Sequence, residues 1–142
     1  RTMIISSKFP PNYREIEDVL GNLAEHNPVF CYGGVLYNPF KRELLPDVLA
    51  HEQVHSAQQG ENPVEWWYKY LHDKEFRLSQ EIEAYGAQYR FAKEHGVSGK
   101  LLDWLKEKLA LELSGEAYGI LISYGEAVSK IRHFNKKLSS AG

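Results

Sequence analysis

Cysteine is almost absent from this sequence, which contains Cys31 alone. A single cysteine can form no disulfide within the chain and cannot supply a cysteine cluster for zinc. Cys31 lies in the short apolar run at residues 29–32, so we expect a buried small side chain rather than a nucleophile. No signal peptide opens the sequence, and together with the lone cysteine this leads us to expect a cytoplasmic protein.

Long apolar runs and an excess of positive charge are also missing. No apolar stretch approaches the roughly 20 residues that cross a membrane as a helix. The formal net charge is -2, which argues against a basic surface for nucleic acid. We therefore expect neither membrane nor nucleic-acid partners. The chain has 142 residues, 43% of them hydrophobic and 25% charged, which predicts one globular domain over residues 1–142.

The motif that is present, H-E-x-x-H, consists of His51, Glu52 and His55. Residues four apart share one face of a helix, so both histidines can point at one metal ion. Glu52 lies one step round the helix and can hydrogen-bond a water in the open position of the metal. The alternative is that the histidines are ordinary polar residues on an exposed helix face.

The surroundings of the motif predict a helix. Pro46 suits a first helical turn, and the acidic Asp47 beside it suits the positive end of a helix. No glycine or proline interrupts residues 47–59, and Gly60 follows as a stop. Apolar residues recur at helical spacing along this run, so we expect an amphipathic helix that carries the motif.

A catalytic zinc needs a third protein ligand and keeps one position for water. Downstream, residues 77–94 read as a second helix that ends near Gly96. Glu81 and Glu83 are the candidate ligands on it. Because they are two residues apart, they point in directions about 200° apart around the helix.

With this motif and the segment E-I-E-A-Y at 81–85, the sequence resembles the gluzincins, peptidases whose third zinc ligand is a glutamate on a following helix. The resemblance covers residues 44–89 and suggests a small, single-domain bacterial or phage-like member. It implies that Zn²⁺ is held by His51, His55 and Glu81, and that Glu52 is the general base. Glu83 remains an alternative ligand. The family often has aspartate four residues after the ligand, where this chain departs with Tyr85.

The resemblance implies a zinc-dependent metalloendopeptidase that acts on peptide or protein substrates. Two alternatives stay open: a domain that binds zinc without catalysis or serves as an interaction module, and a zinc amidase that acts on a non-peptide or cell-wall amide. A structural site would tend to close its fourth position with a protein ligand and needs no general base. The sequence keeps Glu52 and offers no clear fourth ligand, which favours the enzyme.

Two further features of the family have candidates in this chain. Gluzincins often place a group that stabilises the oxyanion downstream of the metal helices, where this sequence has Tyr118, Tyr124 and His133. Zincins also bind extended substrate by strand addition along an edge strand that precedes the metal helix. By resemblance, residues 35–37 or residues 29–31 form that edge, and a plain core hairpin is the alternative.

The predicted fold is α+β: a mostly helical, zincin-like minimal gluzincin domain with a small N-terminal β-sheet or hairpin. Capping and turn signals set the remaining boundaries. The expected elements are a strand within 3–9, a helix over 12–26 begun by an Asn12–Glu15 capping box, strands at 29–32 and 35–37 around Gly33-Gly34, a short helix from Asn62-Pro63 through 71, a helix over 100–113, and a last helix from a Ser123 cap to about 137.

Overall fold

Helices dominate the structure. The computed structural model describes residues 3–141, and it describes side chains as far as residue 133. In chain order, with η for a 3-10 helix, the elements are β1 (Ile4–Ser6), α1 (Tyr13–Leu20), η1 (Ala24–His26), β2 (Phe30–Tyr32), β3 (Val35–Tyr37), α2 (Pro46–Gln59), α3 (Pro63–His72), α4 (Lys74–Glu94), α5 (Gly99–Leu113), η2 (Glu116–Tyr118) and α6 (Tyr124–Ala141). The predicted class, α+β and mostly helical with a small sheet, is confirmed.

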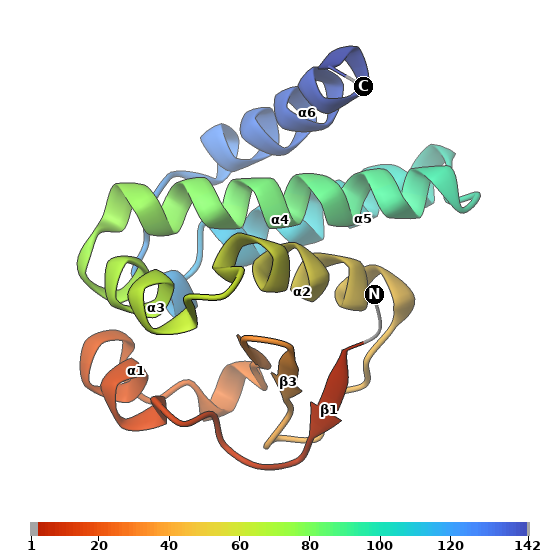
Figure 1. Cartoon of the computed structure of the whole chain (residues 1–142). Helices are drawn as coiled ribbons and strands as arrows, with labels where there is room; N and C mark the ends of the chain where they lie inside the picture. The colour runs from red at the N-terminus through yellow and green to blue at the C-terminus, as the bar shows by residue number, and fades with distance from the viewer. Residues whose placement is uncertain (1–2, 142) are drawn as a thin grey trace.

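Helix α4 forms the centre of the helical part and packs against α2, α3, α5 and α6 (Figure 1). Its contacts with α5 and α6 enclose a core cluster that includes the fully buried Leu109 and Ile131. The helix begins at Lys74, earlier than predicted, because Asp73 caps it. The carboxylate of Asp73 accepts a hydrogen bond from the backbone N–H of Phe76 at 3.0 Å.

The small sheet has the order β1-β3-β2. β2 and β3 form the predicted antiparallel hairpin, in which Tyr32 lies opposite Val35 across the two-residue turn at Gly33 and Gly34. Gly33 has a φ of +63°, which glycine adopts without strain in such a turn. β1 pairs in parallel with the other side of β3. The prediction that residues 35–37 form a substrate-binding edge is therefore wrong, because β3 is paired on both sides.

Helix α1 is shorter than the predicted helix over 12–26. It ends at Leu20 because Gly21 takes a φ of +83°, and the chain continues into the separate turn η1. The predicted capping box at Asn12 is also wrong. Asn12 has φ −103° and ψ 23°, not the extended backbone of a helix cap, and it makes no side-chain cap hydrogen bond. Among the described residues, its side-chain oxygen and nitrogen are buried without a partner.

The predicted helix caps at Asn62 and Ser123 are confirmed. Asn62 accepts a hydrogen bond from the backbone N–H of Glu65 at 3.2 Å, and Ser123 accepts one from that of Glu126 at 3.2 Å. The motif helix α2 begins with Pro46 in its first turn, and Gly60 ends it with a φ of +55°. α6 continues to Ala141, past its predicted end. None of the helices within the described part of the chain is both long and apolar enough to cross a membrane.

Candidate metal centre

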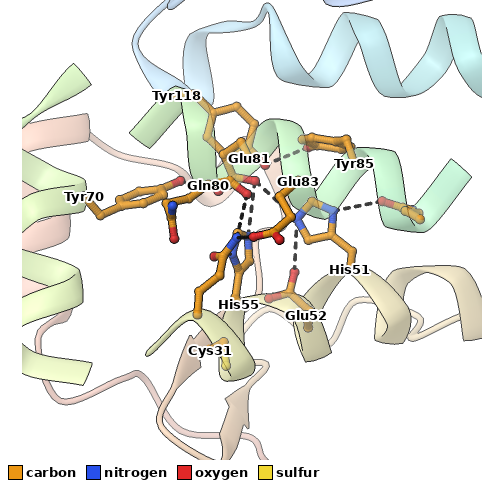
Figure 2. A network of polar contacts seen from close by, with 12 residues as sticks. Cys31, His51, Glu52, His55, Tyr70, Gln80, Glu81, Glu83, Tyr85 and Tyr118 are labelled. Atoms are coloured by element: carbon orange, nitrogen blue, oxygen red, sulfur yellow. Dashed lines mark hydrogen bonds and ion pairs between the residues drawn. The ribbon is translucent and has the colours of Figure 1, made fainter. Parts of the chain in front are cut away.

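The packing of α2 against α4 brings His51, His55 and Glu81 together (Figure 2). Oε1 of Glu81 lies 3.3 Å from Nε2 of His51 and 3.2 Å from Nε2 of His55. The three residues are only 5%, 5% and 3% exposed. The alternative that the histidines lie on an exposed helix face is therefore wrong.

This donor set fits a divalent metal ion. One ligand atom from each of the three residues lies within 4.8 Å of the other two. Two ligand atoms bound to one zinc ion at about 2.1 Å, with tetrahedral angles, would be about 3.4 Å apart. The separations between Glu81 and the histidines match that spacing. Two imidazoles and one carboxylate suit a transition ion such as zinc, and three ligands would leave one position of a tetrahedral ion open.

The two candidate glutamates on α4 are separated by the structure. Glu81 joins the histidines, whereas Glu83 accepts a hydrogen bond from Nε2 of Gln58 at 2.7 Å and lies outside the group of ligand atoms. The second carboxylate oxygen of Glu81, Oε2, accepts a hydrogen bond from the hydroxyl of Tyr70 at 2.6 Å. This role of Tyr70 was not predicted from the sequence, because an aromatic residue beside two tryptophans is expected simply to be buried.

The charges at the centre are strongly coupled. Burial by itself would raise the pKa of Glu81, but the two imidazoles beside it outweigh burial and hold that pKa far below its usual range. Burial would lower the pKa of His55, but the Glu81 carboxylate raises it to about 9. Glu81 is therefore ionised at neutral pH, which is the state that a metal ligand needs.

Glu52 lies beside the centre, as the motif predicted. Its Oε2 is 3.9 Å from Nε2 of His51, and the residue is 7% exposed. Burial raises the pKa of Glu52, while His51, His55 and, more weakly, Arg42 act in the opposite direction. The structure thus places a carboxyl group next to the ligands without including it among them.

Two cavities meet at the centre, and His51, Glu52 and Tyr118 line both. The first is a small cavity of about 80 Å³. Its walls are mainly apolar, from Ile16, Leu20, Leu23, Phe30, Trp66 and Trp67. The second is a larger cleft of about 470 Å³ between the start of β2 and α5. Its charged lining residues include Arg42, Lys108, Glu112 and Glu116. The centre thus has a mainly apolar cavity on one side and a polar cleft on the other.

Of the three downstream candidates for oxyanion stabilisation, only Tyr118 lies near the centre (Figure 2). Tyr124 is 41% exposed, and His133 is exposed and faces Ser129 at 3.2 Å. The hydroxyls of Tyr118 and Tyr85 are hydrogen-bonded at 2.6 Å. Burial raises the pKa of both tyrosines well above the usual value, so both stay protonated at neutral pH.

Tyr85, four residues after Glu81, supports the centre by packing. Its ring meets that of His51 nearly edge to face, with centroids 4.4 Å apart. The atoms that hydrogen-bond Nδ1 of the histidines belong instead to Gln88 and Gln58. The sequence spacing could have identified both glutamines. Gln88 lies two helical turns after Glu81, and Gln58 lies one turn after His55, so each shares a helix face with a ligand.

Strand β2 lies at the edge of the described sheet and packs on α2. Its Cys31 carbonyl already accepts hydrogen bonds from Nε2 of Gln59 at 2.8 Å and from Nε1 of Trp67 at 3.0 Å. The edge is therefore covered at Cys31. Phe30 and Cys31 line the small cavity, and Val29, just before the strand, lines both cavities. Cys31 is buried, as predicted, and burial raises the pKa of its thiol to about 12.

No family model matches the chain, and no curated protein or solved structure matches it either. The capacity of His51, His55 and Glu81 to hold a metal ion rests on their geometry and donor chemistry.

Proposed function

We propose that this protein is a zinc-dependent metallopeptidase of the gluzincin type. The observation that carries the proposal is the convergence of His51, His55 and Glu81, with Glu52 beside them and outside the ligand group. A site that only stabilises the fold tends to use four protein ligands and has no need of a neighbouring base. The three-ligand group therefore favours catalysis over a purely structural role.

When bound, zinc would polarise the scissile carbonyl and lower the pKa of a coordinated water to about 7. Glu52 takes the proton of the attacking water and then delivers it to the leaving amine. Its placement supports this role, because the carboxyl lies within 4 Å of a ligand atom and lines both cavities. A mostly apolar wall on one side limits competing water around it.

We assign the oxyanion role to Tyr118. Tyr85 donates its hydroxyl proton to Glu112 at 3.3 Å, so the hydroxyl of Tyr118 donates to Tyr85. Rotation of that O–H bond toward the cavity would let Tyr118 donate to the oxygen of the substrate as negative charge develops there. The substrate is a peptide that places an apolar side chain in the small cavity and lies across the larger cleft.

The test compares purified wild type with Glu52→Gln. We expect about one zinc per chain in both proteins, cleavage of a mixed peptide library by wild type, and a loss of rate of about 10²- to 10⁴-fold in Glu52→Gln. Elemental analysis and mass spectrometry of the products measure these quantities. Glu75→Gln, an exposed residue at the start of α4, is the matched control and should cleave like wild type.

Three outcomes would contradict the proposal. Undiminished cleavage by Glu52→Gln would remove the assigned base. Stoichiometric zinc without peptide cleavage would favour the non-catalytic module, unless wild type hydrolyses cell-wall or other non-peptide amides, which would indicate the amidase. Failure of wild type to bind added zinc would remove the metal centre altogether.

A further inference from the structure

Each metal-facing histidine is held from behind by a glutamine. Nδ1 of His51 lies 3.0 Å from Oε1 of Gln88, a buried residue of α4. Nε2 of Gln88 then donates a hydrogen bond to the Asp47 carboxylate in the first turn of α2, at 2.8 Å. The series of hydrogen bonds from Asp47 through Gln88 to His51 thus crosses from α2 to α4 and back.

The second histidine has an equivalent chain of contacts. Nδ1 of His55 lies 2.8 Å from Oε1 of Gln58. Nε2 of Gln58 donates to Oε1 of Glu83 at 2.7 Å and to the backbone carbonyl of Gln80 at 3.1 Å. Glu83, the alternative ligand in the sequence, is therefore engaged with Gln58 rather than with the histidines.

The carboxylates of Asp47 and Glu83 determine the orientation of the Gln88 and Gln58 amides. An ionised carboxylate only accepts hydrogen bonds, and the NH₂ group is the only donor end of a glutamine side chain. Each NH₂ therefore faces its carboxylate, Asp47 or Glu83, and each amide oxygen faces an imidazole. An amide oxygen accepts only, so Nδ1 of the histidine must carry a proton. A neutral imidazole then has its lone pair on Nε2, where a metal ion can bind it.

A histidine that binds the metal keeps one proton, and that proton could instead lie on Nε2. A proton on Nε2 would be donated to Oε1 of Glu81, which lies 3.3 Å from His51 and 3.2 Å from His55. That tautomer has no lone pair facing the metal position. A glutamine turned by 180° would accommodate it, because the oxygen and NH₂ ends of an amide have nearly the same shape.

We propose that Asp47 and Glu83 are positioning residues that fix the metal-binding tautomers of His51 and His55 through the orientation of Gln88 and Gln58. This assignment rests on metal binding by the proposed centre and does not depend on peptide cleavage. Removal of Asp47 frees the amide of Gln88 to turn, so in part of the population the proton that remains on His51 would lie on Nε2 and block the metal. Removal of Glu83 loosens Gln58 less, because the Gln80 carbonyl still accepts a hydrogen bond from its NH₂ group at 3.1 Å.

The first experiment measures zinc affinity by competition with a chromogenic chelator. We expect Asp47→Ala to bind Zn²⁺ about tenfold more weakly than wild type, the lower range for partners that orient metal ligands. Glu83→Ala should lose less, because the Gln80 carbonyl still holds the NH₂ group of Gln58. Glu94→Ala is the matched control, since Glu94 is an exposed acid near the end of α4 that pairs with Arg90. It should bind like wild type.

A rescue experiment separates tautomer control from a general structural effect. Glutamate in place of the glutamine presents only acceptors to the imidazole and has no donor end to turn toward it. The double variants Asp47→Ala/Gln88→Glu and Glu83→Ala/Gln58→Glu should therefore recover wild-type or tighter zinc affinity. With Co²⁺ in place of Zn²⁺, they should also recover the wild-type visible spectrum. A merely structural loss at Asp47 or Glu83 would persist in the double variants.

Each outcome supports or overturns the assignment. Wild-type affinity in both single variants, or no recovery in folded double variants, would overturn it and leave the proposed metallopeptidase intact. Circular dichroism identifies folded variants, and the two chains of contacts serve as independent trials if one double variant fails to fold. Wild type that binds no zinc would remove both this assignment and the proposed function.

Discussion

The hydroxyl of Tyr70 donates a 2.6 Å hydrogen bond to one carboxylate oxygen of Glu81, while the other oxygen faces both motif histidines. Tyr70 belongs to α3, so a third helix orients Glu81, the ligand on α4 that faces the histidines of α2. The tyrosine is buried and its ring stacks on Trp66, with centroids 4.8 Å apart. Burial and the nearby Glu81 raise the pKa of Tyr70 well above the usual value, which keeps it a donor.

Loss of this hydrogen bond should weaken both the fold and the metal site. Tyr70→Phe keeps the ring but leaves a buried carboxylate oxygen without its donor, which typically costs about 1.5–3 kcal/mol. We expect the free energy of unfolding to fall by about that amount and zinc affinity to fall with it. Denaturant unfolding and chelator competition measure the two effects. Tyr68→Phe, on the exposed face of the same helix, should change neither.

The ligand assignment on α4 predicts unequal effects at its two glutamates. Glu81→Ala removes a ligand atom and should abolish stoichiometric zinc in protein purified without chelator. Glu83→Ala removes only a partner of Gln58 and should still yield about one zinc per chain at saturating metal. Elemental analysis decides between them. Loss of zinc from the Glu83 variant alone would move the third ligand to that residue.

Tyr118 and Tyr124 offer a matched pair for the oxyanion role. Tyr118→Phe should lower kcat by about 10²-fold while zinc content stays unchanged, because the lost donor acts mainly as charge develops in the transition state. Tyr124→Phe should have no effect, since Tyr124 is exposed and lines neither cavity. Peptide-cleavage kinetics on a substrate found in the library test both variants. Equal activity of Tyr118→Phe and wild type would contradict the assignment.

The buried thiol predicts a pH dependence. Burial raises the pKa of Cys31 from the ordinary 9.0 to about 12. Between pH 9 and pH 12, the thiol therefore loses its proton in the unfolded chain and keeps it in the folded chain. The contribution of the protonated thiol to stability is therefore complete below pH 9 and declines as pH rises toward 12. At pH 9.5, iodoacetamide should modify denatured protein quickly and folded protein very slowly.

An added surface thiol provides the control for that experiment. Ser7→Cys places a second cysteine at an exposed position. The folded variant should take up one equivalent of iodoacetamide at residue 7 and none at Cys31, as mapped by mass spectrometry. Rapid modification of Cys31 in the folded protein would show that the thiol is accessible.

The helix boundaries show which local signals were reliable. Asn62 and Ser123 cap helices as predicted, because each accepts from the backbone N–H three residues later. Asn12 has the same residue pattern, but its backbone is not extended, so no cap forms.

The sequence by itself determined the parts of the site that depend on helix geometry alone. His51 and His55 share a face, with Glu52 beside them, because the helical backbone sets the positions of residues one and four apart. Only the tertiary structure decided that Glu81 rather than Glu83 meets the histidines, since that choice depends on how α4 is rotated against α2. It likewise brought in Tyr70, Gln88 and Tyr118, which approach the centre through contacts that span 11 to 37 positions in the sequence and belong to the packed fold.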